Sequence, residues 1–315
     1  MPSSSVRTFS DPDDYAASIR AQSAELTITA AGQFAGKVVQ VELHDLRLQR
    51  LSENLPQISH ACIQPGRSVV SFWTRSVAGA AWNGVEVQPS QLVRHGEAEQ
   101  FYRRASGPSE RATMSLPSDV MAAAVARMAD RDRTPRRQGR VVTPHPAAMA
   151  KLQRLHAEVG HLAENAPQVI ANSEAARGLE HGLVEAMVDC LATGAVAEDS
   201  LACRGHERIM QRFHAAIAEH PEEAIYIPEL CAKVGVPERT LRLCCQEGLG
   251  IGPKRYLMLR RMDLARQALR RADAMVTTVT AIAANFGFFS FGRFSVLYKT
   301  LYGEMPSMTL RAPPP

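Results

Sequence analysis

Two seven-residue stretches in the last third of the chain share one pattern, and this repeat constrains the fold more than any other feature. Residues 230–236 read Leu-Cys-Ala-Lys-Val-Gly-Val, and residues 282–288 read Ile-Ala-Ala-Asn-Phe-Gly-Phe. Six or seven residues after each glycine comes a large apolar residue, Leu241 or Phe294. A glycine that adopts positive φ ends a short helix, and the apolar residue packs a second helix at a steep angle. The repeat therefore predicts two helix-turn-helix units.

A single long helix is expected to join the two units, which span about residues 227–247 and 278–301. This helix begins at Pro253, a residue suited to a first helical turn, and ends near Arg271. It is about 28 Å long at about 1.5 Å per residue, and successive major-groove faces of a duplex lie about 34 Å apart. We therefore expect two recognition helices in consecutive major grooves of double-stranded DNA.

The charge distribution favours a polyanionic partner. The chain has a net charge of only +4, but residues 228–299 hold twelve lysine and arginine residues against five acidic residues. This segment therefore carries about +7, which leaves about −3 for the remainder. Concentrated positive charge attracts nucleic acid, although a solvated basic face has the same composition.

The first recognition helix opens at Pro237. Its buried side is expected to carry small or apolar residues, namely Leu241 and Cys244 or Cys245. Arg239 and Arg242 lie three positions apart, so they share its outer face and can both read the O6 and N7 acceptors of guanine. Glu238 either accepts from a cytosine amino group or caps the helix start, and we favour the cap.

The second recognition helix, residues 290–299, is less polar. Its candidate base-contacting edge consists of Phe291, Gly292, Arg293 and Ser295, and its buried side of Phe294, Leu297 and Tyr298. Phe291 either touches a thymine methyl group or adds to the core, and we favour the core. Ser290 is expected to cap the helix, with the first backbone amides facing a phosphate. The other predicted phosphate contacts are Thr240, Lys254, Arg255 and Lys299.

Residues 24–116 show the period-two alternation of half-buried strands. Val39, Val41 and Leu43 alternate with polar residues, and Asn83-Gly84 is typical of a turn. Many short strands separated by turns favour an antiparallel sandwich or barrel. We therefore predict an α+β protein of two domains, in which a β-rich N-terminal domain precedes a wholly helical C-terminal domain.

The domain boundaries follow from changes in composition. We expect a disordered tail at 1–20, a β-rich sensory domain at 21–129, a linker rich in Arg, Pro and Gly at 130–146, a helical segment at 147–205 and the DNA-binding domain at 206–311. The helical segment carries apolar stripes. It either pairs two protomers or packs on its own β domain.

Other classes of protein are disfavoured. No run approaches the roughly 18 apolar residues of a membrane span, and the polar first residues differ from a signal peptide. The six cysteines show no zinc or disulfide spacing, which suits reduced thiols. We therefore expect a cytoplasmic, nucleoid-associated protein without catalytic residues, metal ligands or cofactor.

Residues 206–311 resemble the DNA-binding domain of the AraC/XylS family of bacterial transcription regulators. The resemblance rests on spaced residues across the whole segment. In its first half these are Leu230, Ala232, Gly235, Val236, Arg239, Leu241, Leu249, Gly250, Pro253, Tyr256, Leu257, Arg261 and Ala265. In its second half they are Ile282, Ala283, Gly287, Phe288, Ser290, Phe294, Tyr298, Lys299, Gly303, Pro306 and Ser307.

The resemblance implies that Arg239, Arg242 and Leu243 face bases, and that the chain is a sequence-specific regulator, expected to be an activator. It also implies a cupin-like sensory domain with a small-molecule effector, and it suggests RNA polymerase and a second protomer as further partners. Leu243 and Val296 stand where the family has polar or basic residues, which weakens hydrogen-bond readout. Cys245 replaces a bulky aromatic residue. Residues 249–253 are similar to a subgroup that includes the ethanolamine-utilisation regulator.

Three competing functions are considered. The first is an enzyme or metal-binding cupin with a DNA-binding appendage, but His44, His60 and His95 are scattered and no His-x-His occurs. The second is a DNA-repair methyltransferase, for which no Pro-Cys-His or four-cysteine zinc set is present. The third is a non-specific architectural DNA binder, against which the paired Arg239 and Arg242 argue.

Overall fold

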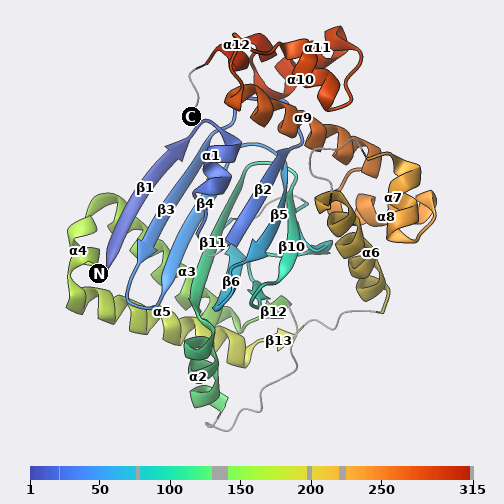
Figure 1. Ribbon diagram of the computed structural model, residues 1–315. Coiled ribbons are helices and arrows are strands. Elements are labelled where there is room, and N and C mark those ends of the chain that lie inside the picture. Colours follow the sequence, from blue (N-terminus) through green and yellow to red (C-terminus); the bar gives the residue numbers. More distant parts are fainter. Residues whose placement is uncertain (21, 76–78, 130–140, 197–200, 220–224, 313–315) are drawn as a thin grey trace.

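The chain folds into a β-rich N-terminal part and a helical C-terminal part, which confirms the predicted α+β class (Figure 1). The computed structural model describes residues 1–20, 22–75, 79–129, 141–196, 201–219 and 225–312. In Figure 1 the helical part lies along one end and one side of the sheets, and α9 (Pro253–Arg271) runs along the end where β2 lies.

The N-terminal part contains two antiparallel sheets. The larger sheet has the order β1-β3-β4-β11-β6-β9-β12-β13, with bounds Ser3–Phe9, Gly36–Glu42, Arg47–Glu53, Ser109–Pro117, Arg67–Trp73, Leu92–His95, Val141–Thr143 and Ala195–Val196. The smaller sheet has the order β2-β5-β10-β7-β8, with bounds Gln22–Ile28, Gln57–Ile63, Gln100–Ala105, Ala81–Trp82 and Val85–Glu86. The predicted Asn83-Gly84 turn joins β7 to β8, and both residues have positive φ.

Apolar side chains from both sheets meet in the core of this domain. Trp73 of β6 and Trp82 of β7 are buried, with ring centroids 4.5 Å apart, and Phe101 of β10 belongs to the same cluster. Large buried aromatic rings contribute much of the energy of such a core. The two sheets therefore pack face to face, as expected for a sandwich or barrel.

Helices cover the other face of the larger sheet. They are α2 (Ser118–Ala129), α3 (Pro146–Asn165), α4 (Pro167–Ala171) and α5 (Ser173–Thr193). Leu152 of α3 and Met187 of α5 are fully buried in one cluster with strand residues such as Leu48 and Val70. The helical segment thus packs on its own β domain, which is one of the two alternatives that the sequence left open.

Two segments differ from the boundaries expected from sequence. The predicted disordered tail at 1–20 instead forms β1, which pairs with β3, and α1 (Pro12–Ala17), which Asp11 caps. Of the predicted linker, residues 130–140 lie outside the described residues, whereas β12 pairs with β9. β1 is an edge strand, which needs backbone hydrogen bonds to one neighbour only. Its side chains are mostly exposed, so its sequence shows no alternation of apolar and polar residues.

The helical part follows the predicted order closely. After α6 (Leu201–Ala218) come α7 (Ile227–Val234), α8 (Glu238–Leu249), α9, α10 (Val279–Asn285), α11 (Phe291–Tyr302) and α12 (Pro306–Arg311). One end of α9 packs with α7 and α8 through Tyr256 and Leu257. The other end packs with α10 and α11 through Met262 and Leu269. A single helix therefore belongs to both helix-turn-helix cores.

A buried carboxylate ties α1 to the sheets. Glu53 of β4 is fully buried and accepts hydrogen bonds from Tyr15 of α1 (2.8 Å) and Ser109 (2.7 Å). Arg103 lies 3.3 Å from the same carboxylate, and Arg111 also binds it. Burial alone would raise the pKa of Glu53, but the two arginines and the hydrogen bonds outweigh it and lower the pKa to about 2.

Glu53→Gln removes the carboxylate that binds Arg103 and Arg111, and among the described residues it leaves these two buried arginines without an ion-pair partner. We expect the free energy of unfolding to fall by roughly 3–5 kcal/mol, measured by urea denaturation. Since the folded pKa is lowered, the carboxylate stabilises the fold above its ordinary pKa, and this stabilisation disappears as the pH falls from about 4.5 towards 2.

The control is Glu110→Gln. Glu110 pairs with the exposed Arg75 at 3.2 Å, so its loss should cost less than about 1 kcal/mol. Equal stability of Glu53→Gln and the wild type would show that the network does not stabilise the fold.

Candidate DNA-binding surface

The first repeated motif forms a helix-turn-helix. Gly235 caps α7 with a φ of 72°, and α8 follows three residues later. Leu241, Cys244 and Cys245 are all buried against α6 and α9. The positive φ explains why glycine is needed at the turn, and the predicted buried side of the helix is confirmed.

The outer face of α8 carries the residues predicted to contact bases. Arg239, Arg242 and Leu243 are exposed, while Thr240 is half-buried. The side chain of Glu238 pairs with Arg242 at 3.1 Å, and no side chain caps the start of α8. Glu238 is thus the acidic residue in the first turn of α8, as favoured from the sequence, but its carboxylate makes no capping hydrogen bond and reaches forward one helical turn to Arg242. Such an exposed pair contributes little energy and opens readily.

The second motif repeats this arrangement. Gly287 has a φ of 75°, and Phe294 and Tyr298 of α11 are buried. Leu297, predicted to be buried with them, is half-buried. Ser290 stands at the predicted N-cap position, but its side chain makes no capping hydrogen bond.

The outer face of α11 is mostly apolar. Phe291 is 40% exposed and Val296 is 69% exposed, so Phe291 does not add to the core as favoured from the sequence. Gly292 and Arg293 are exposed, and Ser295 is half-buried. Lys299 is exposed in the last turn.

A basic depression connects α8 with the first turns of α9. Its volume is about 560 Å³, and Arg242, Lys254, Arg255 and Arg261 line it together with Glu238. Ile227 and Met258 supply apolar surface, and Gln246 lies at the same wall. The structure thus brings the predicted base-contacting Arg242 next to the predicted phosphate contacts Lys254 and Arg255. Four cations beside one carboxylate suit an anionic backbone.

Arg261 also links the two units. Its guanidinium lies over the Phe288 ring at 5.5 Å, close to the second turn. Tyr302 of α11 donates a hydrogen bond of 2.6 Å to Asp263 of α9. These contacts add to the shared apolar core and hold α8 and α11 in one arrangement along α9.

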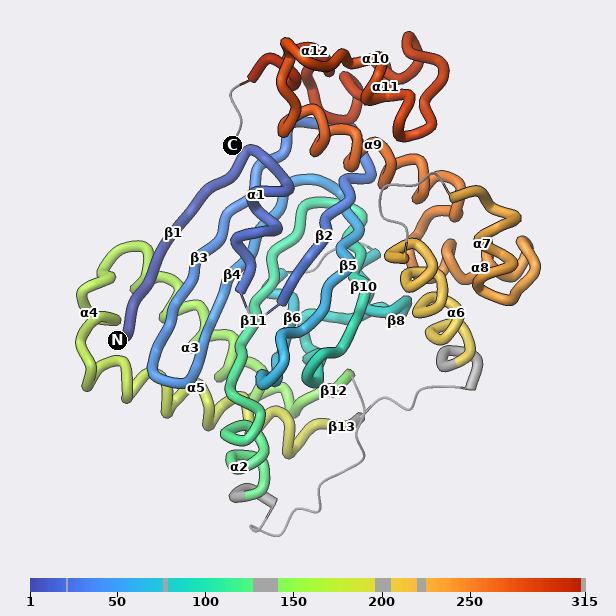
Figure 2. The backbone as a smooth tube through the Cα atoms, viewed as in Figure 1, coloured from blue at the N-terminus to red at the C-terminus, as the bar shows by residue number. Residues whose placement is uncertain are grey.

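Two arginines of α9 face the β domain rather than solvent. Arg270 binds Asp11 at 2.7 Å and Asp14 at 3.1 Å, and Arg266 also binds Asp11. Gln267 donates to Asp13 at 2.9 Å. We call these residues of α9 and of the α1 turn the aspartate clasp; Figure 2 shows α1 next to α9. Arg266 and Arg270 therefore do not add to the DNA-facing charge.

Comparisons with known proteins identify the helical part. Residues 230–312 match the family described as "Helix-turn-helix domain". The chain is 34% identical over 136 residues to the probable thc operon regulatory protein of Rhodococcus erythropolis. The aligned segment makes up 41% of this chain and 41% of that protein. It is 32% identical over 109 residues to the XylDLEGF operon transcriptional activator 3 of Pseudomonas putida. The aligned segment makes up 35% of this chain and 32% of that protein.

This is an AraC-type helix-turn-helix domain. The chain matches at most about two fifths of the length of these relatives. An AraC-type regulator structure from Chromobacterium violaceum covers 34% of this chain and 93% of its own, at 23% identity and a TM-score of 0.31. ToxT from Vibrio cholerae covers 92% of this chain and 98% of its own, at 11% identity and a TM-score of 0.29.

Among the described residues, no group of three or more His, Cys, Asp or Glu side chains is placed to hold a metal ion. His44, His60 and His95, which the sequence analysis found too scattered for a cupin metal site, belong to no such group there. In the same part of the chain, no helix is long and apolar enough to cross a bilayer.

Sequence reasoning missed two features around the AraC-type domain. It did not place Gln246 and Arg261 in the basic depression. Each of them lies one or two helical turns further along a helix face on which the sequence analysis had already chosen a residue. It also missed the aspartate clasp, because the acidic run at 11–14 was taken for part of a disordered tail. The sequence did contain one sign of a helix here, namely three aspartates next to a Tyr-Ala-Ala segment that is compatible with a helix.

Asp11→Asn tests the aspartate clasp. Asparagine can still cap α1, but it removes the charge that binds Arg266 and Arg270. We expect a stability loss of roughly 1–3 kcal/mol, the cost of leaving largely buried groups poorly satisfied. Hydrogen exchange should also become faster in α1 and in the C-terminal half of α9. Asp119→Asn, in the exposed first turn of α2, is the control. Unchanged exchange in both segments of Asp11→Asn would contradict the clasp.

Proposed function

We propose that the chain is a sequence-specific transcription regulator whose helices α8 and α11 enter consecutive major grooves of promoter DNA. The exposure of Arg239 and Arg242 on the second helix of an AraC-type unit carries this proposal. Buried arginines at these positions would have excluded it. Both relatives named above are regulators of operons by their names, and the second is called an activator. We therefore propose activation as the outcome.

The two recognition helices differ in the chemistry they offer. On α8, Arg239 and Arg242 suit guanine, and Leu243 adds an apolar contact. On α11, Phe291 and Val296 suit thymine methyl groups, with Gly292, Arg293 and Ser295 beside them. We propose that α8 reads bases mainly through charged hydrogen bonds and α11 mainly through shape and apolar contact.

The remaining candidate residues are assigned to the DNA backbone. Lys254 and Arg255 are exposed in the first turn of α9, and Lys299 is exposed at the end of α11. Thr240 and Ser290 lie near the starts of their helices, where backbone amides favour phosphate. Contacts of this kind position a protein on DNA and raise its affinity without selecting a sequence.

The β domain is proposed to sense a small-molecule effector, and its contacts with α9 would carry the signal to the DNA-binding helices. RNA polymerase is the proposed partner in activation. Dimerisation through exposed surfaces of α3 and α5 remains a proposal, and so does action at the nucleoid in the cytoplasm. The alternative, an enzyme or metal-binding cupin with a DNA-binding appendage, has no supporting residue cluster in the described part of the chain.

Arg239→Ala should relax base preference at one position of the binding site. Arg239 is exposed and has no ion-pair partner among the described side chains, so its guanidinium is available to a base. Loss of a bidentate contact to guanine costs roughly 1–3 kcal/mol of discrimination. Selection of bound sequences from a random duplex pool measures it, with Arg271→Ala, at the exposed end of α9, as control. An equal loss of affinity for every sequence would contradict base readout.

Lys254→Ala should instead weaken binding to all sequences alike. Removal of one phosphate contact lowers the steepness of the salt dependence of log K by about one unit. Fluorescence anisotropy with specific and random duplexes over a range of salt concentrations measures this slope. A changed sequence preference, with an unchanged slope, would show that Lys254 contacts a base.

A further inference from the structure

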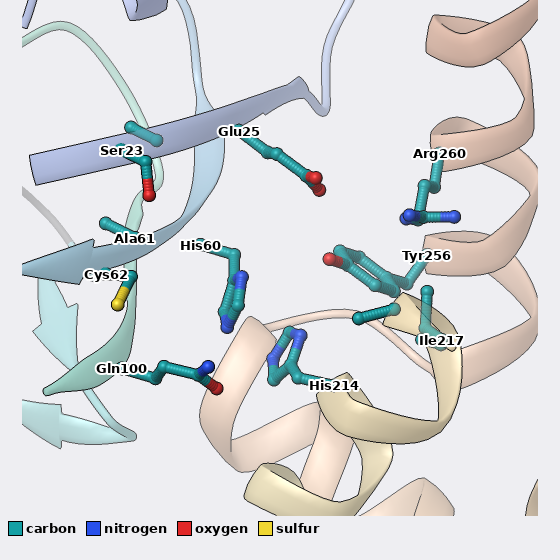
Figure 3. Close-up of a pocket in the computed structure, with 12 residues that line it drawn as sticks. Ser23, Glu25, His60, Ala61, Cys62, Gln100, His214, Ile217, Tyr256 and Arg260 are labelled. Atoms are coloured by element: carbon teal, nitrogen blue, oxygen red, sulfur yellow. The ribbon is translucent and has the colours of Figure 1, made fainter. Parts of the chain in front are cut away.

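A pocket lies between the two domains, outside the β core. The outer face of the smaller sheet forms one wall, with Glu25 of β2, His60 of β5 and Gln100 of β10. Helices α6 and α9 form the other wall, with His214, Tyr256 and Arg260. The cavity volume is about 280 Å³, near the lower end of small-molecule sites. Figure 3 shows these side chains converging on it from both domains.

His214 has an unsatisfied polar atom at this pocket. Its side chain is 6% exposed, and its Nε2 atom has no hydrogen-bond partner among the described residues. Its ring stacks on His60, with centroids 4.5 Å apart and an interplanar angle of 13°. Buried polar atoms are normally hydrogen-bonded, because an unpaired one costs free energy. The position of this atom in the pocket wall therefore indicates a bound hydrogen-bonding molecule.

The charges of the pocket are of opposite sign on opposite walls. Burial lowers the pKa of His60, which Glu25 and Arg260 also influence, and burial lowers the pKa of His214 further. Burial raises the pKa of Tyr256. The imidazoles and the phenol are therefore uncharged near neutral pH, and the Gln100 amide carries no charge. Glu25 and Arg260 remain as the charged groups.

We propose that this pocket binds a small zwitterion, whose ammonium group faces Glu25 and whose carboxylate faces Arg260. A zwitterion complements both of these pocket-lining groups at once, which a ligand with one charge cannot do. The guanidinium offers several donors, so a carboxylate can bind it beside its existing contacts. His214 and Tyr256 supply hydrogen bonds to the part of the ligand between the two charges.

The inference that this pocket is the effector site rests on the proposed function. The inference that it binds a zwitterion does not. The ligand would touch β2 and β5 in one domain and α6 and α9 in the other. It therefore favours the docked arrangement over any arrangement in which the domains separate. Since α9 belongs to both helix-turn-helix cores, binding is coupled to the position of the recognition helices.

Thermal denaturation of the full chain tests the ligand class. The probes are the L-α-amino acids, β-alanine and γ-aminobutyrate, each compared with its methyl ester, which lacks the carboxylate, and its N-acetyl derivative, which lacks the ammonium group. We expect at least one zwitterion to raise the melting temperature, and both of its derivatives to have much smaller effects. No effect from any zwitterion, or equal effects from its derivatives, would overturn the proposal.

Titration calorimetry with the best probe locates the site. Glu25→Gln, Arg260→Gln and His214→Phe should each weaken binding by about tenfold or more, which corresponds to about 1.4 kcal/mol. The matched controls Glu86→Gln and Arg271→Gln, both at exposed positions outside the pocket, should keep the wild-type Kd. Unchanged binding by the first three variants would place the ligand elsewhere and overturn the proposal.

DNA binding measured in parallel separates this inference from the proposed function. Amino-acid binding without any DNA binding would contradict the regulator and leave the pocket intact. DNA binding without amino-acid binding would contradict the pocket alone. When both occur, the zwitterion should shift DNA affinity in the wild type but not in Glu25→Gln.

Discussion

The buried carboxylate of Glu53 anchors one of the contacts that join the two domains. It holds Tyr15, and thereby α1, against the sheets, and the aspartates at the start of α1 hold Arg266 and Arg270 of α9. Burying a carboxylate costs free energy that a single ion pair would not offset. Several hydrogen-bond donors bind this one carboxylate and together offset that cost. Positive charge on α9 is thus divided by position: Lys254 and Arg255 in its first turn face solvent, whereas Arg266 and Arg270 are neutralised by aspartates of the other domain.

The helical part was predictable from sequence because its signals are local. Glycine at a turn, proline in a first turn and apolar residues three and four positions apart each act within one or two helical turns, so the expected bounds of α9 agree with the structure. The same reasoning selected Arg239 and Arg242 as exposed residues. It failed for Phe291, since an aromatic side chain at a helix start gives no local sign of which way it faces.

Features built from distant residues could not be predicted in this way. Glu53 and its partners come from β4, β10, β11 and α1, and each looks like an ordinary polar residue in its own segment. The aspartate clasp joins residues more than 250 positions apart. The zwitterion pocket likewise needs β2, β5, β10, α6 and α9 together. Only the fold brings such groups within reach of one another.

The sharing of α9 between both cores has a consequence for operators. In the proposed binding mode, α9 fixes the distance and the angle between α8 and α11, so the protein would set the rotational phase of the two half-sites. One extra base pair between them would turn the second half-site by about 34°, because the duplex completes a turn in about 10–10.5 base pairs. Binding then requires twisting or bending of the DNA, which makes the flexibility of the uncontacted spacer part of what is recognised.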